Sequence, residues 1–161
     1  MVGMSLARSC ACVAGLWTIA AVSASCHNES IPFTKQAEVS GHWAITANDV
    51  SGGGLTCNVA GLTVALIQTD TTFTGTVLAG TITCVQGIFT GTRPADIGST
   101  VSGTVVTRDI AINDTAIGAS LTGTVDNGDM VMSGTCSVQL TLGDGSVVTV
   151  TGPWSGQRTG G

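Results

Sequence analysis

From Gly41 onward, apolar residues alternate with threonine, serine and other polar residues over most of the chain. A period of two places alternate side chains on opposite faces of a β-strand, so these runs predict strands with one buried face. None of the runs has the 3.6-residue period of an amphipathic helix, and the predicted fold class is all-β. The eight predicted strands cover Gly41–Ala47, Leu62–Thr69, Thr72–Leu78, Gly80–Val85, Val101–Ile112, Ala119–Asp126, Met130–Leu142 and Ser146–Arg158.

Several connections between these runs are rich in residues that form turns. Ser51–Gly54, Asp126–Asp129 and Gly143–Gly145 contain glycine, asparagine or aspartate, which accept the positive φ angles of tight hairpins. Strands joined by short connections pair as antiparallel neighbours, and eight of them can close into an up-and-down β-barrel. A β-sandwich is the alternative, because periodicity does not distinguish one closed sheet from two packed sheets.

A short motif, apolar–Thr/Ser–Gly–Thr, recurs on several of the predicted strands. Its five copies lie in Phe73–Val77, Phe89–Thr92, Val101–Val105, Leu121–Val125 and Met132–Cys136. In each copy the glycine has the parity of the flanking apolar residues, so we expect it to face inward. An inward glycine lets a sheet coil tightly and makes room for a large side chain opposite. The alternative is that these glycines hollow out a ligand cavity.

Pro153 lies inside the last predicted strand. Proline cannot donate a hydrogen bond to a central ladder, and a closed barrel has no edge strand to accommodate it. We therefore expect a bulge at this point, or else an open seam.

The first 25 residues have the features of an export signal. Arg8 precedes the apolar stretch Cys10–Val22, which is too short to span a bilayer and is followed by small residues. Cleavage before Cys26 would leave this cysteine as the acylated first residue of a lipoprotein, with residues 26–40 as a polar tether and 41–161 as the β-barrel domain. The alternative is cleavage after Ala24 and a freely secreted protein, in which Cys26 is an ordinary disulfide partner.

The cysteines that remain after leader removal are Cys26, Cys57, Cys84 and Cys136. Exported proteins reach a compartment that permits disulfides. Cys57 lies in the long first connection and Cys84 at the end of the fourth predicted strand, so we predict a Cys57–Cys84 bridge that pins this connection to the barrel. Cys136 shares the parity of its apolar neighbours, which predicts a buried, inert thiol if it is unpaired.

Composition excludes several functions. The charged residues make up 9% of the chain and the net charge is -5, so the basic surface of a nucleic-acid-binding protein is absent. The chain has no Cys-x-x-Cys pair, and His27 and His42 are isolated, so no metal is expected. No histidine is placed to act as a base for a nucleophile, and the aspartates flank turns, where aspartate is an ordinary turn residue. We therefore expect neither an enzyme nor a cofactor.

The opening Gly41-His-Trp43, with Arg158 on the last strand, resembles the Gly-x-Trp start and late arginine of lipocalins. Phe73–Thr76 and Trp154–Gln157 are similar to strand fragments of avidin-like barrels. Both families form eight-stranded up-and-down barrels, and the lipocalin resemblance implies that Trp43 closes one barrel end under Arg158, a cation–π contact. The biotin site of avidin depends on tyrosine, which this chain lacks, so biotin binding is not implied. The overall pattern most resembles small exported β-barrel lipoproteins of bacteria.

The expected function is binding without catalysis. In the first hypothesis the barrel holds a small apolar ligand, with Phe73, Met130 and Met132 as wall residues and Trp43 closing the far end. In the alternative the protein is a binding module or inhibitor that contacts an envelope protein through its loops and outer face. The expected location is the cell envelope, either outer membrane or periplasm, with a lipid at Cys26 as the membrane anchor; free secretion is the alternative.

Overall fold

The computed structural model describes residues 35–161, which contain nine strands and no helix. The predictions for residues 1–34, namely the signal peptide, the acylated Cys26 and most of the tether, lie outside the described residues. The strands are β1 (Gly41–Gly52), β2 (Leu55–Thr69), β3 (Thr72–Gln86), β4 (Phe89–Pro94), β5 (Thr100–Val106), β6 (Asp109–Asp114), β7 (Ala119–Val125), β8 (Val131–Thr141) and β9 (Val147–Gly160).

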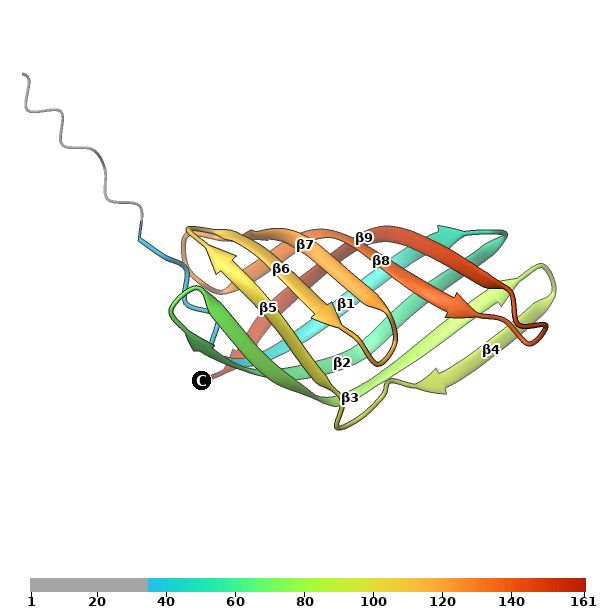
Figure 1. Cartoon of the computed structure of the whole chain (residues 1–161), viewed down its shortest axis with the longest axis horizontal. Helices are drawn as coiled ribbons and strands as arrows, with labels where there is room; N and C mark the ends of the chain where they lie inside the picture. The colour runs from blue at the N-terminus through green and yellow to red at the C-terminus, as the bar shows by residue number, and fades with distance from the viewer. Residues whose placement is uncertain (1–34) are drawn as a thin grey trace, which may run out of the picture. The chain divides into compact units, whose positions relative to one another are not determined.

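Eight of these strands form a closed antiparallel up-and-down barrel (Figure 1). The hydrogen-bonded order is β2-β1-β9-β8-β7-β6-β5-β3-β4, and an additional β2–β3 pairing closes the ring. The predicted barrel is therefore confirmed and the β-sandwich is excluded. The ninth strand, β4, pairs only with β3 and lies outside the ring.

The wall of the barrel is complete at one end and interrupted toward the other. The first part of β3 pairs with β5, from Thr72 to Thr76, whereas its last part, from Thr81 to Gln86, pairs with β4. β5, β6 and β7 have only 6 or 7 residues, while β2 and β3 have 15 each. We call the end that contains Trp43 and Arg158 the closed end, and the end with the β1–β2, β3–β4 and β8–β9 hairpins the open end (Figure 1).

Several predicted strand boundaries are wrong because bulges break the alternation. The predicted strands Thr72–Leu78 and Gly80–Val85 are one strand, β3, whose register with β2 shifts near Gly80 and Gly61, two glycines with positive φ. The connection expected between the first two strands is mostly strand, because β1 extends to Gly52 and β2 begins at Leu55, with bulges that interrupt the alternation. The predicted strand Val101–Ile112 is two strands that reverse at Thr107, a β-branched residue with φ of 58° that carries no turn signal. β4 was not among the predicted strands.

The bulge expected at Pro153 is present, and its extra residue lies in the neighbouring strand β1. Pro153 pairs with Thr135 of β8, while the register between β9 and β1 shifts between Ala47 and Ser51 of β1. Asp49, inside this shift, has φ of 55°. The extra residue in β1 lies beside the proline, so the missing N–H falls where the ladder is already interrupted.

The inward direction of the motif glycines is confirmed on four of the five copies. A Cβ built on Gly103 would overlap the Ala111 carbonyl oxygen and the Phe73 ring. The glycines of β3, β7 and β8 are similarly close to neighbouring backbone. Gly91 on β4 is the exception, since a Cβ there meets open space. At Gly103 the freed volume is therefore filled by the Phe73 side chain rather than left as a ligand cavity.

Candidate functional site

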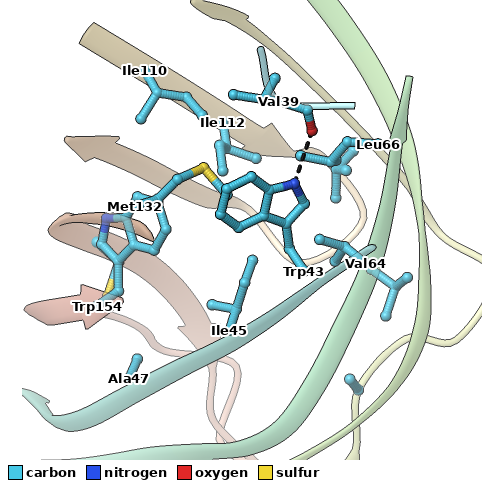
Figure 2. Packing of buried hydrophobic residues seen from close by; sticks show 14 of the residues in the cluster. Val39, Trp43, Ile45, Ala47, Val64, Leu66, Ile110, Ile112, Met132 and Trp154 are labelled. Atoms are coloured by element: carbon cyan, nitrogen blue, oxygen red, sulfur yellow. Dashed lines mark hydrogen bonds between the residues drawn. The ribbon is translucent and has the colours of Figure 1, made fainter. Parts of the chain in front are cut away.

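The closed end is sealed by the segment that precedes β1. Ala37 and Val39 are completely buried, so these residues are part of the core rather than of a free linker. The Trp43 indole Nε1–H donates a hydrogen bond of 2.8 Å to the Val39 carbonyl oxygen (Figure 2). Figure 2 also shows Met132 between the indole rings of Trp43 and Trp154, a favourable sulfur–aromatic arrangement.

Arg158 lies on the outside of residues 37–40 and the Trp43 side chain, which together we call the plug. Its guanidinium carbon lies 4.9 Å from the centroid of the Trp43 ring, which confirms the predicted cation–π contact. The same guanidinium donates to the backbone carbonyl oxygens of Ser40, Glu38 and Asp129. These bonds fix the plug to β9, so this end of the barrel offers no entrance.

Most of the ionic contacts of the described residues also lie at the closed end. The Asp129 carboxylate contacts the Arg108 guanidinium and lies 3.5 Å from Lys35 Nζ. Burial by itself raises the pKa of Asp129, but the hydrogen bond and positive charge of Arg108, with a smaller contribution from Lys35, hold this pKa below its usual value. Asp129 is therefore an ionised structural carboxylate.

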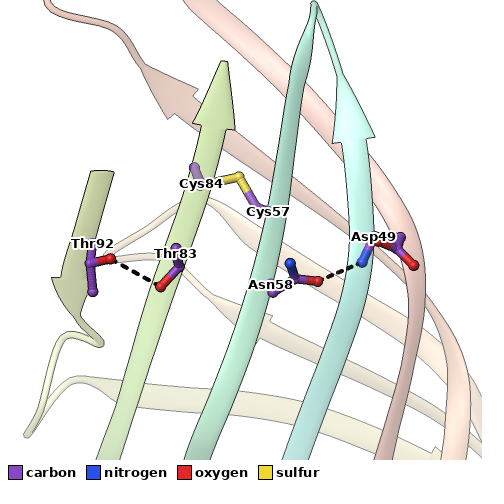
Figure 3. Close-up of a disulfide and its surroundings, with 6 residues drawn as sticks. All are labelled: Asp49, Cys57, Asn58, Thr83, Cys84 and Thr92. Atoms are coloured by element: carbon purple, nitrogen blue, oxygen red, sulfur yellow. Dashed lines mark hydrogen bonds between the residues drawn. A yellow bond between two sulfur atoms is a disulfide. The ribbon is translucent and has the colours of Figure 1, made fainter. Parts of the chain in front are cut away.

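The open half carries the disulfide. Cys57 and Cys84 are bonded, as predicted, and their Cα atoms are 4.0 Å apart. The two cysteines are directly opposite each other on β2 and β3, so the bond joins adjacent strands and does not pin a loop (Figure 3). Nearby, the Asp49 N–H donates to Asn58 Oδ1 at 2.9 Å, and the hydroxyls of Thr83 and Thr92 lie 3.1 Å apart.

Cys136 is a free, buried thiol, as predicted. Burial raises the pKa of this thiol, and the thiol donates to the Gly152 carbonyl oxygen, 3.4 Å away. A neutral buried thiol is a weak nucleophile, so Cys136 contributes a small apolar surface to the barrel interior.

An apolar cavity of about 100 Å³ lies in the barrel interior, on the open-end side of the Trp43 plug. It is bounded by inward side chains of nearly every barrel strand, including Val50, Val64, Val77, Ile112, Val138 and Val150. Asp96 and Asp114 are the only charged residues among those that line it. The site is thus an apolar chamber with a small acidic region.

The residues predicted to form the ligand site do not line this cavity. Phe73, Met132 and Trp43 are buried in the closed-end core, and Met130 is 48% exposed on the chain just before β8. Trp43 does close the far end, as expected. The cavity residues could be recognised in the sequence as inward-facing, but alternation does not show where inward side chains leave space.

A groove of about 630 Å³ adjoins the cavity, in the interrupted part of the wall. It lies between β4 and the end of β8, with Thr92 and Arg93 on one side and Gln139 and Thr141 on the other. Groove and cavity share three lining residues: Ile82, Ile117 and Leu140. The cavity is therefore next to a wide, partly polar groove in the open half of the molecule.

Asp114 is the one buried charged residue of the described chain, with 6% of its surface exposed. Its Oδ1 accepts a hydrogen bond of 2.9 Å from the Ala116 N–H, and its Oδ2 accepts one of 3.3 Å from the Ser99 hydroxyl. No cation of residues 35–161 forms an ion pair with it. The carboxylate is thus hydrogen-bonded but has no positive partner.

Comparisons with known proteins give no relative: no family model, curated protein or solved structure matches this chain. Within residues 35–161 no helix is long and apolar enough to cross a membrane, and no three metal-ligating side chains gather in one place. The arguments for function therefore rest on the barrel interior itself.

Proposed function

We propose that this protein is an exported, lipid-anchored binding protein without a catalytic site, which holds a small apolar ligand in the open half of its barrel. The observation that carries the proposal is the cavity of about 100 Å³, whose lining is apolar except for Asp96 and Asp114. The Cys57–Cys84 disulfide supports a location outside the cytoplasm, because such bonds persist in oxidising compartments.

The size of the cavity limits the ligand. An engineered apolar cavity of roughly 150 Å³ binds benzene or xenon. A chamber of about 100 Å³ accepts a group no larger than a small ring or a branched chain of a few carbons. A longer ligand would place its remainder in the adjoining groove, where Thr92 and Gln139 offer polar contacts.

A cavity-filling substitution tests this proposal. Val138 lines the cavity, and Val138→Phe would occupy part of its volume. Val131→Phe is the matched control, because Val131 lies on the same strand and is exposed. We expect benzene to bind the wild type and Val131→Phe with equal affinity, and to bind Val138→Phe at least about tenfold more weakly. NMR titration measures the three affinities. Equal affinity for all three proteins would refute binding in the cavity.

Intact mass spectrometry of the protein made with its own leader tests the rest of the proposal. A denatured mass that includes acyl chains at Cys26 would support the lipid anchor, and a lipid-free mature mass would replace it with free secretion. A compound present in the native mass and lost on denaturation would be the natural ligand.

A second candidate function, protein binding through the open end, is favoured by one observation. The tip of the β3–β4 hairpin exposes Ile88 and Phe89, which are 93% and 75% exposed, and Val147 is exposed at the β8–β9 hairpin. Exposed apolar side chains near one another can mark a partner surface. We expect the wild type to capture a specific partner by cross-linking in an envelope extract, and an Ile88→Ser, Phe89→Ser double variant to lose it. Identical capture by the wild type and the variant would count against this function.

A further inference from the structure

The cavity combines an apolar chamber with a carboxylate that has no countercharge. Transferring a carboxylate from water into an apolar environment is costly unless it is paired, and hydrogen bonds from neutral groups offset only part of this cost. Asp114 receives two such bonds, from Ser99 and Ala116, and lines the chamber. A positively charged group placed in the chamber would supply the missing partner.

The charged residues that line the cavity are both negative. Asp96, the second carboxylate of the cavity lining, is exposed to solvent, and no lysine, arginine or histidine is among the lining residues. Lys35, Arg108 and Arg158 are engaged at the closed end. Arg93 lines the adjoining groove and forms no ion pair within the described chain. Both charged residues that line the chamber itself are thus carboxylates, which favours cations over anions there.

We infer that the ligand is a small amphiphilic amine: an ammonium group paired with Asp114 and attached to an apolar group that fills the chamber. This inference rests on the proposed binding function and adds a positively charged end to the apolar ligand. The ammonium donates to the free lone pairs of the carboxylate, while Ser99 and Ala116 keep the carboxylate oriented. An anionic ligand of the same shape would place two like charges in a chamber without a cation.

Three probes with the same isobutyl group test the charge preference directly: 3-methylbutylammonium, 3-methylbutan-1-ol and 3-methylbutanoate. With the wild-type chain we expect the ammonium to bind at least about tenfold more tightly than the alcohol, since a charge-assisted bond in a low-dielectric site is much stronger than a neutral one. The anionic probe, 3-methylbutanoate, should bind more weakly than the alcohol. NMR titration gives all three affinities, and added salt should weaken only the binding of the ammonium.

Asp114→Asn removes the charge and keeps the shape, because its amide oxygen can still accept from the Ala116 N–H. We expect this variant to bind the ammonium no more tightly than the alcohol, and to bind the alcohol within about twofold of the wild type. Asp109→Asn is the control, since Asp109 begins the same strand but is exposed; it should leave all three affinities unchanged. If Asp114→Asn does not fold, the order of the three probes on the wild type still decides the question.

The outcomes separate this inference from the function on which it rests. If benzene and the alcohol bind but the ammonium has no advantage, the amine ligand class is wrong and apolar binding stands. If the ammonium binds equally well to Asp114→Asn, another group recognises it and the role of Asp114 is overturned. If neither benzene nor any probe binds, the cavity is a packing void and both proposals fail.

Discussion

At the residue scale, the recurring Ser/Thr-Gly-Thr motif has one sequence signature but two structural environments. Gly103 on β5 lies under the Phe73 ring and against the Ala111 backbone, where no side chain fits. Gly91 on β4 has open space in the Cβ direction. Both glycines occupy the same place in the motif, so the difference arises from what the fold puts opposite them.

This difference predicts opposite responses to the same substitution. Gly103→Ala should destabilise the protein by about 2 kcal/mol or more, because the new methyl group overlaps backbone and aromatic atoms that cannot all move away. Gly91→Ala should change the free energy of unfolding by less than about 0.5 kcal/mol, or raise it slightly through the lower entropy of the unfolded chain. Urea denaturation of both variants checks this; equal losses would show that Gly103 is not tightly packed.

At the element scale, the disulfide joins β2 and β3 in the part of the barrel where the wall is interrupted. There β3 pairs on its other side with β4, an edge strand outside the ring, and no longer with β5. The bond therefore stabilises the β2–β3 ladder beyond the point where ring closure supports it. Pro94 at the end of β4 is typical of an edge strand, because its missing N–H is not needed there.

Removing the disulfide should lower stability without changing the fold. Cys57 and Cys84 are separated by 27 residues, for which the loop-entropy relation gives about 3.5 kcal/mol. We expect a Cys57→Ser, Cys84→Ser double variant to lose roughly this free energy of unfolding, and a reductant to destabilise the wild type but not the variant. Cys136→Ser is the control that leaves the bond intact; sensitivity of the double variant to reductant would contradict the assignment.

At the scale of the whole molecule, the two ends of the barrel have different physical characters. The closed end is dense and ionic: Trp43 and Met132 fill it, and Arg158, Arg108 and Asp129 bind the plug and turns over it. The open half contains the cavity, the groove and the exposed hairpin tips. Stability is therefore expected to depend mainly on the closed end, and binding on the open half.

The closed end should make the protein sensitive to acid. Since the pKa of Asp129 is lower in the folded protein than the ordinary aspartate value of 3.8, ionised Asp129 stabilises the fold at neutral pH. This contribution is complete above about pH 5 and is lost as the pH falls through 3.8 and below the folded value. We expect Asp129→Asn to be less stable than the wild type at pH 7 and to show a smaller loss between pH 5 and pH 3, measured by urea denaturation.

The control for this prediction is Asp70→Asn. Asp70 has a positive φ, as Asp129 does, but it is exposed and forms no ion pair among the described residues. Its substitution should leave the pH dependence unchanged. If Asp129→Asn and the wild type lose stability in parallel below pH 5, the Arg108–Asp129 pair is not the source of the acid sensitivity.

Features that depend on local parity and residue chemistry can be predicted from the amino-acid sequence alone. Alternation placed the inward and outward faces of the strands and predicted the eight-stranded barrel. Parity, together with the lipocalin resemblance, placed Trp43 and Arg158 where a cation–π contact forms, and the positions of the few cysteines favoured the Cys57–Cys84 bond. These features follow from a period of two and from few cysteines, both of which can be read without knowledge of distant contacts.

Where the barrel is filled and where it is hollow depends instead on tertiary packing. Parity marked Phe73 and Met132 as inward but could not show that they fill the closed end, while smaller residues such as Val138 leave a cavity. β4 and the adjoining groove arise because β3 is longer than β5, so that one strand serves two partners. The burial of Asp114 has the same origin, since its exposure depends on ring closure and on packing from strands distant in sequence, which no local pattern encodes.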